Sequence, residues 1–249
     1  MTARKKTAYI SLQHITKNFP LSSGVFTALD DINIDFQSSE FTCVVGRSGS
    51  GKSTLMNMIT GIDKPTSGKI IVAGKPIQDF SENERALWRG MNLGIVFQFY
   101  QLIPVLSLLE NVMLPMQILG GQDLKKNEEK ALKLLTAVNL QEQAYQRPER
   151  VSGGQQQCAA IARALANDPP IIIADEPTGN LGSDDAAMVL GIFVQLVREG
   201  KTVVMVTHDN DLAQQAHRII QLSDGKVVGD MISTHKGSAN TAGKARHEK

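Results

Sequence analysis

The chain has 249 residues, of which 42% are hydrophobic and 20% are charged. This composition is typical of a globular protein and excludes a disordered, collagen-like or coiled-coil chain over most of its length. The 26 lysines and arginines nearly balance the 25 aspartates and glutamates, so the net charge of +1 predicts no nucleic-acid partner. At about 150 residues per domain, the length is sufficient for one large domain that carries an insertion.

Cysteine content and hydropathy indicate the compartment of the chain and its relation to a membrane. Cys43 and Cys158 lie far apart without CxxC or histidine companions, which predicts neither a disulfide framework nor a zinc site and favours a reducing compartment. The basic N-terminus lacks the apolar segment of a signal peptide, and no stretch of about 18 uncharged apolar residues predicts a membrane span. Prolines and polar residues interrupt the most apolar region, residues 102–119, so we interpret it as an interaction surface.

Two half-buried strands are the first predicted elements. Apolar residues alternate at Ile10 and Leu12 and again over residues 32–36, and the turn-rich residues 20–24 separate the two stretches. The pattern predicts an N-terminal antiparallel β subdomain.

Three apolar runs, residues 41–45, 171–174 and 202–207, predict buried strands that each lead into polar residues. A helix with one apolar face is predicted over residues 184–199, so strands alternate with helices. This alternation predicts an α/β fold whose core is a parallel sheet covered by helices on both sides.

The region from about residue 123 to residue 166 instead predicts helices in succession, because apolar residues recur there at helical spacing. We therefore expect a single domain over residues 1–234, with a helical subdomain inserted at about residues 99–166. Residues 235–249 are poor in apolar groups and rich in lysine and arginine, which predicts a flexible basic tail.

A phosphate-binding loop is the strongest motif. Residues 46–53 satisfy G-x-x-x-x-G-K-[ST] between a predicted strand and a predicted helix. Glycines allow successive backbone N–H groups to point at phosphate oxygens, Lys52 would reach the β- and γ-phosphates, and the Ser53 hydroxyl would bind Mg²⁺. A purely structural turn is the alternative, but the complete match in this context favours a nucleotide site. The predicted binding residues are Gly46, Arg47, Ser48, Gly49, Ser50, Gly51, Lys52, Ser53 and Thr54.

Two carboxylates follow the predicted strand at residues 171–174. Asp175 and Glu176 would lie where a strand end holds one carboxylate near a metal and the next near an attacking water. Acidic residues after a strand are often only solvated, but the upstream phosphate loop supplies a metal and a nucleophile for this pair to serve.

Ser152, Gly153, Gly154 and Gln155 open another predicted helix. Ser152 is a natural N-cap, and the two glycines beside it would expose backbone N–H groups at the positive end of the helix. From chemistry alone, simple capping and a second anion site both remain open.

Together with Gln98 and His208, these motifs resemble an ATP-binding cassette ATPase, and the similarity covers about residues 10–229. In that family two cassettes pair head to tail, with each ATP between the P-loop of one and the signature motif of the other. The resemblance implies a P-loop NTPase (RecA-like) core and a homodimer that encloses two Mg-ATP. The resemblance implies that the predicted anion site at residues 152–155 binds the ATP of the other cassette.

The same resemblance implies roles for single residues. Glu176 corresponds to the general base and Asp175, with Ser53 and Gln98, to the Mg²⁺ ligands. Gln98 also corresponds to the link between the metal site and the helical insert, and His208 to the γ-phosphate switch. Phe19 is the favoured adenine-stacking aromatic, with Tyr9 as a less favoured choice.

Shorter motifs resemble the branch that serves lipoprotein release, macrolide efflux and bacterial cell division; they lie at residues 63–68, at 97–104 with 110–112 and Pro115, and at 167–170. Cassettes of that branch lie beneath an integral-membrane permease, which docks near the segment after Gln98. The resemblance thus implies a cytoplasmic location, peripheral on the inner face of the cell membrane. Docking would use part of the apolar region at residues 102–119, with core packing as the alternative for most of it.

The sequence departs from the family pattern at four positions. Gly182 replaces an aspartate, Cys158 an arginine, Val151 a leucine and Ser39 a glycine. None of these changes removes a phosphate or metal ligand, so hydrolysis is expected to persist. The missing aspartate predicts weaker coupling between the two ATP sites.

We therefore predict an ATP-hydrolysing subunit that powers a separate permease for export or extraction of a lipoprotein, lipid, peptide or macrolide. The alternative is an ATP-dependent regulatory or tethering cassette that acts on a membrane partner without transport. A cassette acting in translation or DNA repair would need a tandem cassette or a long coiled-coil insertion, and the sequence contains neither. A catalytically weak binding module is supported only by Gly182 and Cys158.

Overall fold

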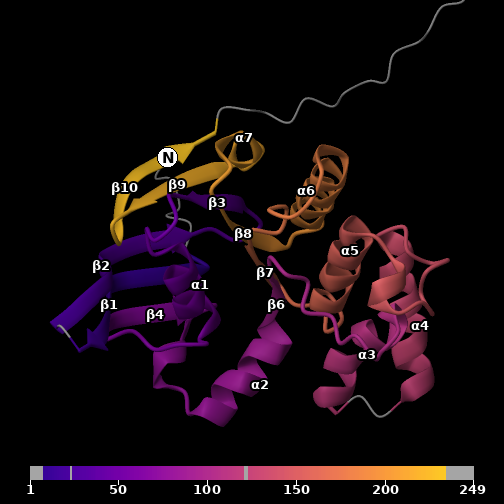
Figure 1. The fold of residues 1–249 in the computed structure, drawn as a ribbon. Coiled ribbons are helices and arrows are strands. Elements are labelled where there is room, and N and C mark those ends of the chain that lie inside the picture. The colour runs from indigo at the N-terminus through magenta and orange to yellow at the C-terminus, as the bar shows by residue number, and fades with distance from the viewer. Residues whose placement is uncertain (1–7, 23, 121–122, 234–249) are drawn as a thin grey trace, which may run out of the picture.

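Two sheets organise residues 8–22, 24–120 and 123–233, which are the residues that the computed structural model describes (Figure 1). The first sheet has the strand order β2-β1-β4-β5, and its neighbouring strands run antiparallel. Ile10 pairs with Phe36 and Leu12 with Ile34, which places the alternating apolar residues in register. The predicted antiparallel β subdomain is confirmed. The strands are β1 Ile10–Leu21, β2 Gly24–Phe36, β4 Ser67–Val72 and β5 Lys75–Pro76.

The second sheet has six strands in the order β10-β9-β3-β8-β7-β6. Its strands are parallel except for β10, which pairs antiparallel with β9 at the edge. Every residue of β3 and of β8 is buried, as the uninterrupted apolar runs predict. The strands are β3 Phe41–Val45, β6 Leu93–Val96, β7 Ile171–Asp175, β8 Thr202–Thr207, β9 Arg218–Ser223 and β10 Lys226–Ile232.

Helices α3, α4 and α5 pack against one another and gather at one side of the molecule, to the right in Figure 1. They lie within the part of the chain for which the sequence predicts a helical insert, and the predicted tail at residues 235–249 lies outside the described residues. The helices are α1 Lys52–Thr60, α2 Glu82–Asn92, α3 Leu108–Ile118, α4 Leu124–Ala137, α5 Gly153–Ala164, α6 Ser183–Arg198 and α7 Asn210–Ala213, with 3-10 turns at Ile77–Asp79 and Pro148–Arg150.

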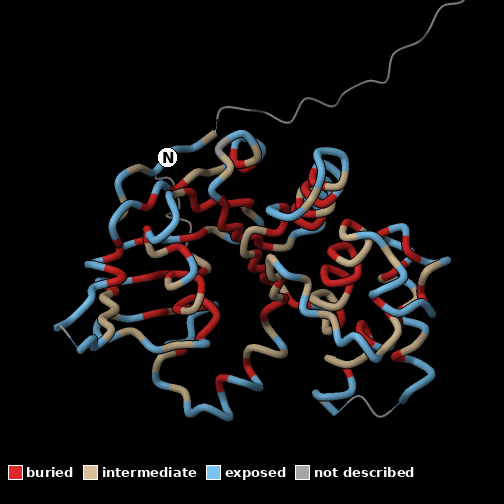
Figure 2. The backbone as a smooth tube through the Cα atoms, viewed as in Figure 1, coloured by how far each residue is buried: buried red, intermediate tan, exposed pale blue. Residues whose placement is uncertain are grey.

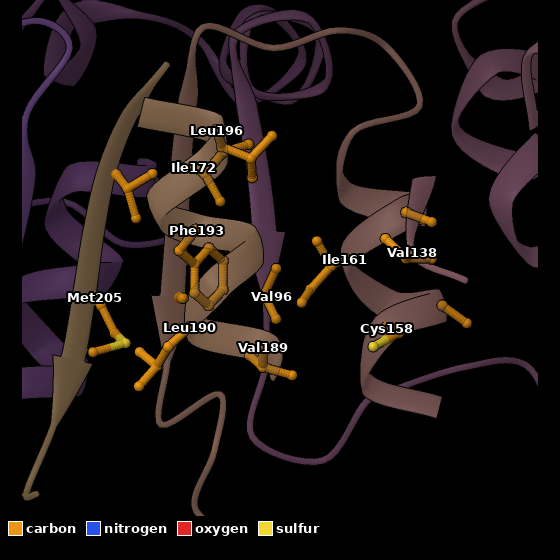
Figure 3. Packing of buried hydrophobic residues seen from close by; sticks show 14 of the residues in the cluster. Val96, Val138, Cys158, Ile161, Ile172, Val189, Leu190, Phe193, Leu196 and Met205 are labelled. Atoms are coloured by element: carbon orange, nitrogen blue, oxygen red, sulfur yellow. The ribbon is translucent and has the colours of Figure 1, made fainter. Parts of the chain in front are cut away.

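The six-stranded sheet separates two hydrophobic cores. Successive residues of a strand point to opposite faces, so Ile172 joins one core and Ile173 the other. The first core packs β7 and β8 against α5 and α6, with Phe193 and Ile161 among its members (Figure 3). Figure 2 shows that burial concentrates along these strands, while the outer loops are exposed. The central strands are therefore held from both sides.

The apolar region at residues 102–119 is partly buried in the core and partly exposed. The sequence leaves core packing and an interaction surface open for this region. Leu108, Val112 and other residues of α3 are buried in the first core. Val105 and Ile118, in contrast, are 71% and 73% exposed. Core packing therefore accounts for the helix face, and the exposed residues stay available for an interaction.

Candidate functional site

The loop between β3 and α1 has a conformation that requires glycine. Gly51 precedes α1 with a φ of 103°, and a Cβ there would lie 2.7 Å from the Ala28 carbonyl oxygen. A Cβ on Gly46 would lie 2.3 Å from the Leu222 carbonyl oxygen. No side chain caps the N-terminus of α1, and its first turn holds no acidic residue. The positive end of this helix is therefore open to an anion.

Lys52 carries its ammonium group into the same loop. Its Nζ donates to the Gly46 carbonyl oxygen at 2.8 Å and to the Arg47 carbonyl oxygen at 3.0 Å, and the residue is buried. Carbonyl oxygens satisfy donors but bring no opposite charge. A phosphate bound in the loop would supply that charge.

Asp175, at the end of β7, faces the start of α1. The Ser53 hydroxyl lies 3.4 Å from Asp175 Oδ2. Burial, and next the charge of Glu176, raise the pKa of the Asp175 carboxyl above its ordinary value. A divalent cation would favour the ionised carboxylate, and a hydroxyl with a carboxylate is a donor set that Mg²⁺ accepts when phosphate oxygens complete its shell. Among the described residues, no cluster of three or more histidine, cysteine or acidic side chains offers a cation a protein-only site.

Glu176 and His208 meet across the ends of β7 and β8. His208 Nδ1 lies 2.9 Å from Glu176 Oε2, and the Thr207 hydroxyl donates to the same oxygen at 3.3 Å. The Glu176 side chain is only 13% exposed. Its backbone adopts a φ of 46°, a left-handed conformation that costs free energy in a residue other than glycine. The fold thus holds the Glu176 carboxylate beside the His208 imidazole at the carboxyl-terminal edge of the sheet.

These groups line one cleft of about 1010 Å³. The cleft brings together most of the phosphate loop with Gln98, Asp175, Glu176 and His208, which come from the ends of β6, β7 and β8. Carboxyl ends of parallel strands meet at one sheet edge, where such folds bind ligands. Of the predicted loop residues, the buried Ser50 does not line the cleft; the lining members are Gly46, Arg47, Ser48, Gly49, Gly51, Lys52, Ser53 and Thr54.

Neither aromatic residue named for adenine stacking lines the cleft. Phe19 lies on β1, where Lys17 Nζ is 5.0 Å from the centroid of its ring, and Tyr9 packs against the second core. Phe26, which pairs directly with Phe19 across the β1–β2 hairpin, is 51% exposed and does line the cleft. Phe26, Ala28 and Gln221 line the cleft but are not among the residues predicted from the sequence. The hairpin register is the signal that identifies Phe26, because it places Phe26 opposite Phe19.

The motif at residues 152–155 lies outside this cleft. Gln155 N donates to Ser152 Oγ at 3.2 Å and Ser152 N donates to Gln155 Oε1 at 3.0 Å, a reciprocal capping box that begins α5. The glycines between them are packed: a Cβ on Gly153 would lie 2.8 Å from the hydroxyl of Tyr100. Simple capping is therefore confirmed as one role of Ser152, and the predicted anion site has no contact with the cleft in a single chain.

The segment that carries Gln98 is fastened to neighbouring elements. The Asn180 side chain donates to the Gln98 carbonyl oxygen at 3.2 Å. The guanidinium of Arg163, on α5, donates to the Tyr100 carbonyl oxygen at 2.8 Å and also to that of Gln101. Tyr100 and Gln101 both have positive φ angles. Hydrogen bonds therefore connect the segment that follows Gln98 to α5.

The positions that depart from the family pattern are accommodated locally. Gly182 is the N-cap of α6, and a Cβ there would meet nothing within 4 Å. Cys158 is buried in the first core, and burial, together with the charge of Asp185, raises the pKa of its thiol to about 11. Val151 packs against the same core. The Ser39 hydroxyl donates to the Gly200 carbonyl oxygen at 2.9 Å.

No helix in the described parts of the chain combines the length and the apolar character needed to cross a bilayer.

Residues 29–179 match the family model for ABC transporters. The chain is 40% identical over 233 residues to the macrolide export ATP-binding/permease protein MacB of Burkholderia pseudomallei, a match that covers 94% of this chain and 36% of MacB. The chain thus spans about a third of the length of MacB. It is 43% identical over 206 residues to the lipoprotein-releasing system ATP-binding protein LolD of Aquifex aeolicus, covering 83% of this chain and 92% of LolD.

A solved structure has the same fold. The dimeric, post-hydrolysis state of the ATP-binding cassette MJ0796 bound to ADP and Pi aligns with a TM-score of 0.85 at 39% identity. The alignment covers 91% of this chain and 99% of that chain. The predicted fold class is confirmed.

Proposed function

The chain belongs to the ABC transporter family, and from this premise we propose that it is an ATP-hydrolysing, nucleotide-binding subunit that powers a membrane permease. The observation that carries the proposal is the single cleft that unites the phosphate loop with Asp175, Glu176, His208 and Gln98. A loop for phosphates, carboxylates for a cation and for water, and an imidazole are the groups that phosphoryl transfer to water requires. The proposed unit is one domain over residues 1–234, with its helical insert at about residues 99–166.

Catalysis consists mainly of positioning and charge neutralisation. The Lys52 ammonium and the uncapped N-terminus of α1 hold the phosphates. Glu176 accepts the proton of the attacking water, and His208, 2.9 Å from its carboxylate, orients that group and faces the terminal phosphate. Mg²⁺ bound by Ser53 and Asp175, with Gln98 nearby, would supply positive charge to the phosphate oxygens.

A second copy of the chain completes each site. The N-terminus of α5 carries the motif predicted to bind an anion but lies outside the cleft of its own chain. Head-to-tail pairing would bring that motif onto the nucleotide of the other copy, and the dimeric state of the related cassette MJ0796 supports this arrangement. The chain therefore acts as an ATP-sandwich homodimer.

The membrane partner docks near the segment after Gln98. Phe99 and Val105 there are 69% and 71% exposed, and the segment is fastened to α5 through Arg163. Similarity to LolD and MacB supports export or extraction of a lipoprotein or a macrolide, and the proposal extends to a lipid or a peptide. The cassette then operates peripherally, on the cytoplasmic face of the cell membrane.

The test is the light-scattering mass of purified Glu176→Gln protein with and without Mg-ATP. Blocked hydrolysis should trap the closed sandwich, so ATP is expected to convert the monomer to a dimer. Wild-type protein with Mg-ADP is the matched control and should stay monomeric. A Glu176→Gln protein that binds ATP and remains monomeric would contradict the proposed homodimer.

A further inference from the structure

Two side chains occupy the space beside the glycines that begin α5. A Cβ on Gly153 would lie 2.8 Å from the Tyr100 hydroxyl, and one on Gly154 would lie 2.3 Å from both the carboxyl carbon and Oδ2 of Asp185. Asp185 Oδ1 lies 2.6 Å from the same point. The carboxyl group of Asp185, from the first turn of α6, therefore lies flat against the first turn of α5.

The charge of Asp185 is directed at this helix end. Among the residues that the structure describes, the Asp185 side chain makes no hydrogen bond or ion pair. Its negative charge nevertheless reaches the neighbours, because it contributes, after burial, to the raised pKa values of Tyr100 and of Cys158. Asp184 precedes Asp185 on α6, but its side chain is exposed.

A carboxylate at the N-terminus of a helix changes what that terminus can bind. It compensates part of the positive potential of the unpaired N–H groups, so a second anion gains less there. It also repels that anion directly, and in a partly buried interface the repulsion is less screened than in water. Asp185 is therefore placed to weaken anion binding by Gly153 and Gly154.

We propose that Asp185 sets the strength of the ATP-driven dimer by opposing the terminal phosphate of the nucleotide that the second copy presents to α5. This inference rests on the proposed function, since only head-to-tail pairing brings a triphosphate to this helix. Asp185 leaves ATP binding within the monomer unchanged, because it is not a residue of the cleft. Its effect is to lower the affinity of the closed dimer and so to favour reopening.

The experiment measures the dimer dissociation constant by light scattering across protein concentration, at saturating Mg-ATP and in the Glu176→Gln background. Asp185→Asn keeps the shape of the side chain and removes its charge. We expect the dissociation constant to fall roughly tenfold, since each dimer closes two such sites and each contributes about threefold. Asp184→Asn, the same charge change one residue earlier on an exposed side chain, should leave it unchanged.

Several outcomes overturn the inference. Equal effects of Asp185→Asn and Asp184→Asn would show that the net charge of the protein, and not the position of Asp185, changes the dissociation constant. A rise in the dissociation constant for Asp185→Asn would mean that the carboxylate stabilises α5 instead. Asp185→Ser is the second variant, and thermal melting verifies that each protein is folded. If the parent dimerises and Asp185→Asn dimerises equally well, the inference fails alone; if no variant dimerises although ATP binds, the proposed homodimer fails with it.

Discussion

Helices α1 and α5 begin in opposite ways. Gly51 starts α1 without a side-chain cap, and an open cleft lies before it. Ser152 starts α5 with a full capping box, and Tyr100 and Asp185 pack against its first glycines. Since the unpaired N–H groups of a helix are what attract an anion, α1 can bind phosphate strongly within one chain. The positive end of α5 is already partly compensated by its capping box and by Asp185, so it would bind an anion more weakly than α1. A weaker contact suits an interface that has to open again.

The largest effect is expected from a change that leaves both helix starts intact. Glu176→Gln should lower ATP turnover by about 10²- to 10⁴-fold, because the amide cannot accept the proton of the attacking water. Nucleotide affinity should be retained, as measured by equilibrium binding beside a phosphate-release assay. Near-normal turnover would show that Glu176 is not the general base and that another group accepts the proton.

One change at each helix start tests whether α1 and α5 differ in phosphate binding. Lys52→Ala should weaken ATP binding by the monomer about 10- to 100-fold, since a charged hydrogen-bond donor is lost from the cleft. Ser152→Ala should leave that affinity unchanged, destabilise α5 by about 1 kcal/mol and weaken the ATP-dependent dimer. Calorimetric titration and light scattering separate the two effects. An equal loss of monomer affinity in both variants would place α5 in the cleft of its own chain.

A smaller effect is expected at Phe26, the aromatic residue of the cleft that could stack on the adenine base. Phe26→Ala should raise the ATP dissociation constant roughly fivefold, because an aromatic face available for stacking is removed. Phe19→Ala is the matched variant and should act less, since Phe19 does not line the cleft. Inorganic triphosphate, which has no base, should bind both variants like the wild type. A larger loss for Phe19→Ala would restore Phe19 as the stacking residue and imply that the hairpin moves when nucleotide binds.

The smallest effect concerns a third helix start, that of α6. Gly182 has an extended backbone and open space around it, so Gly182→Asp should add a cap and stabilise the fold by a few tenths of a kcal/mol. Thermal melting detects this change, with Gly182→Ala as the control for the lost glycine. If the missing aspartate weakens coupling between the ATP sites, turnover should also change. Unchanged turnover would refute that explanation of the departure.

Periodic patterns and local motifs made much of the fold predictable. The apolar runs identify β3, β7 and β8 because those strands are buried on both faces, and Ser152 identifies the start of α5. Helix α2 was not predicted, although Ser81 and Glu84 form a capping box at its start. Its moderate apolar content does not indicate a helix, but the S-x-x-E spacing predicts a helix start at Ser81.

The site was predictable where one strand or loop determines it, and less so where two segments meet. Asp175 and Glu176 follow directly from their strand. Phe26 depends on how the hairpin is registered, which spacing alone does not fix. The contact of Asp185 with Gly154 joins two helices whose packing no local pattern encodes.

The alternation of side chains along β7 has a consequence for how the molecule folds. Ile172 and Ala174 pack into one core and Ile171 and Ile173 into the other, and the strand ends directly in Asp175. A partly folded chain with only one core formed would therefore leave the two carboxylates unplaced. Nucleotide binding should therefore require both cores, and bound ATP should protect them together against unfolding and proteolysis.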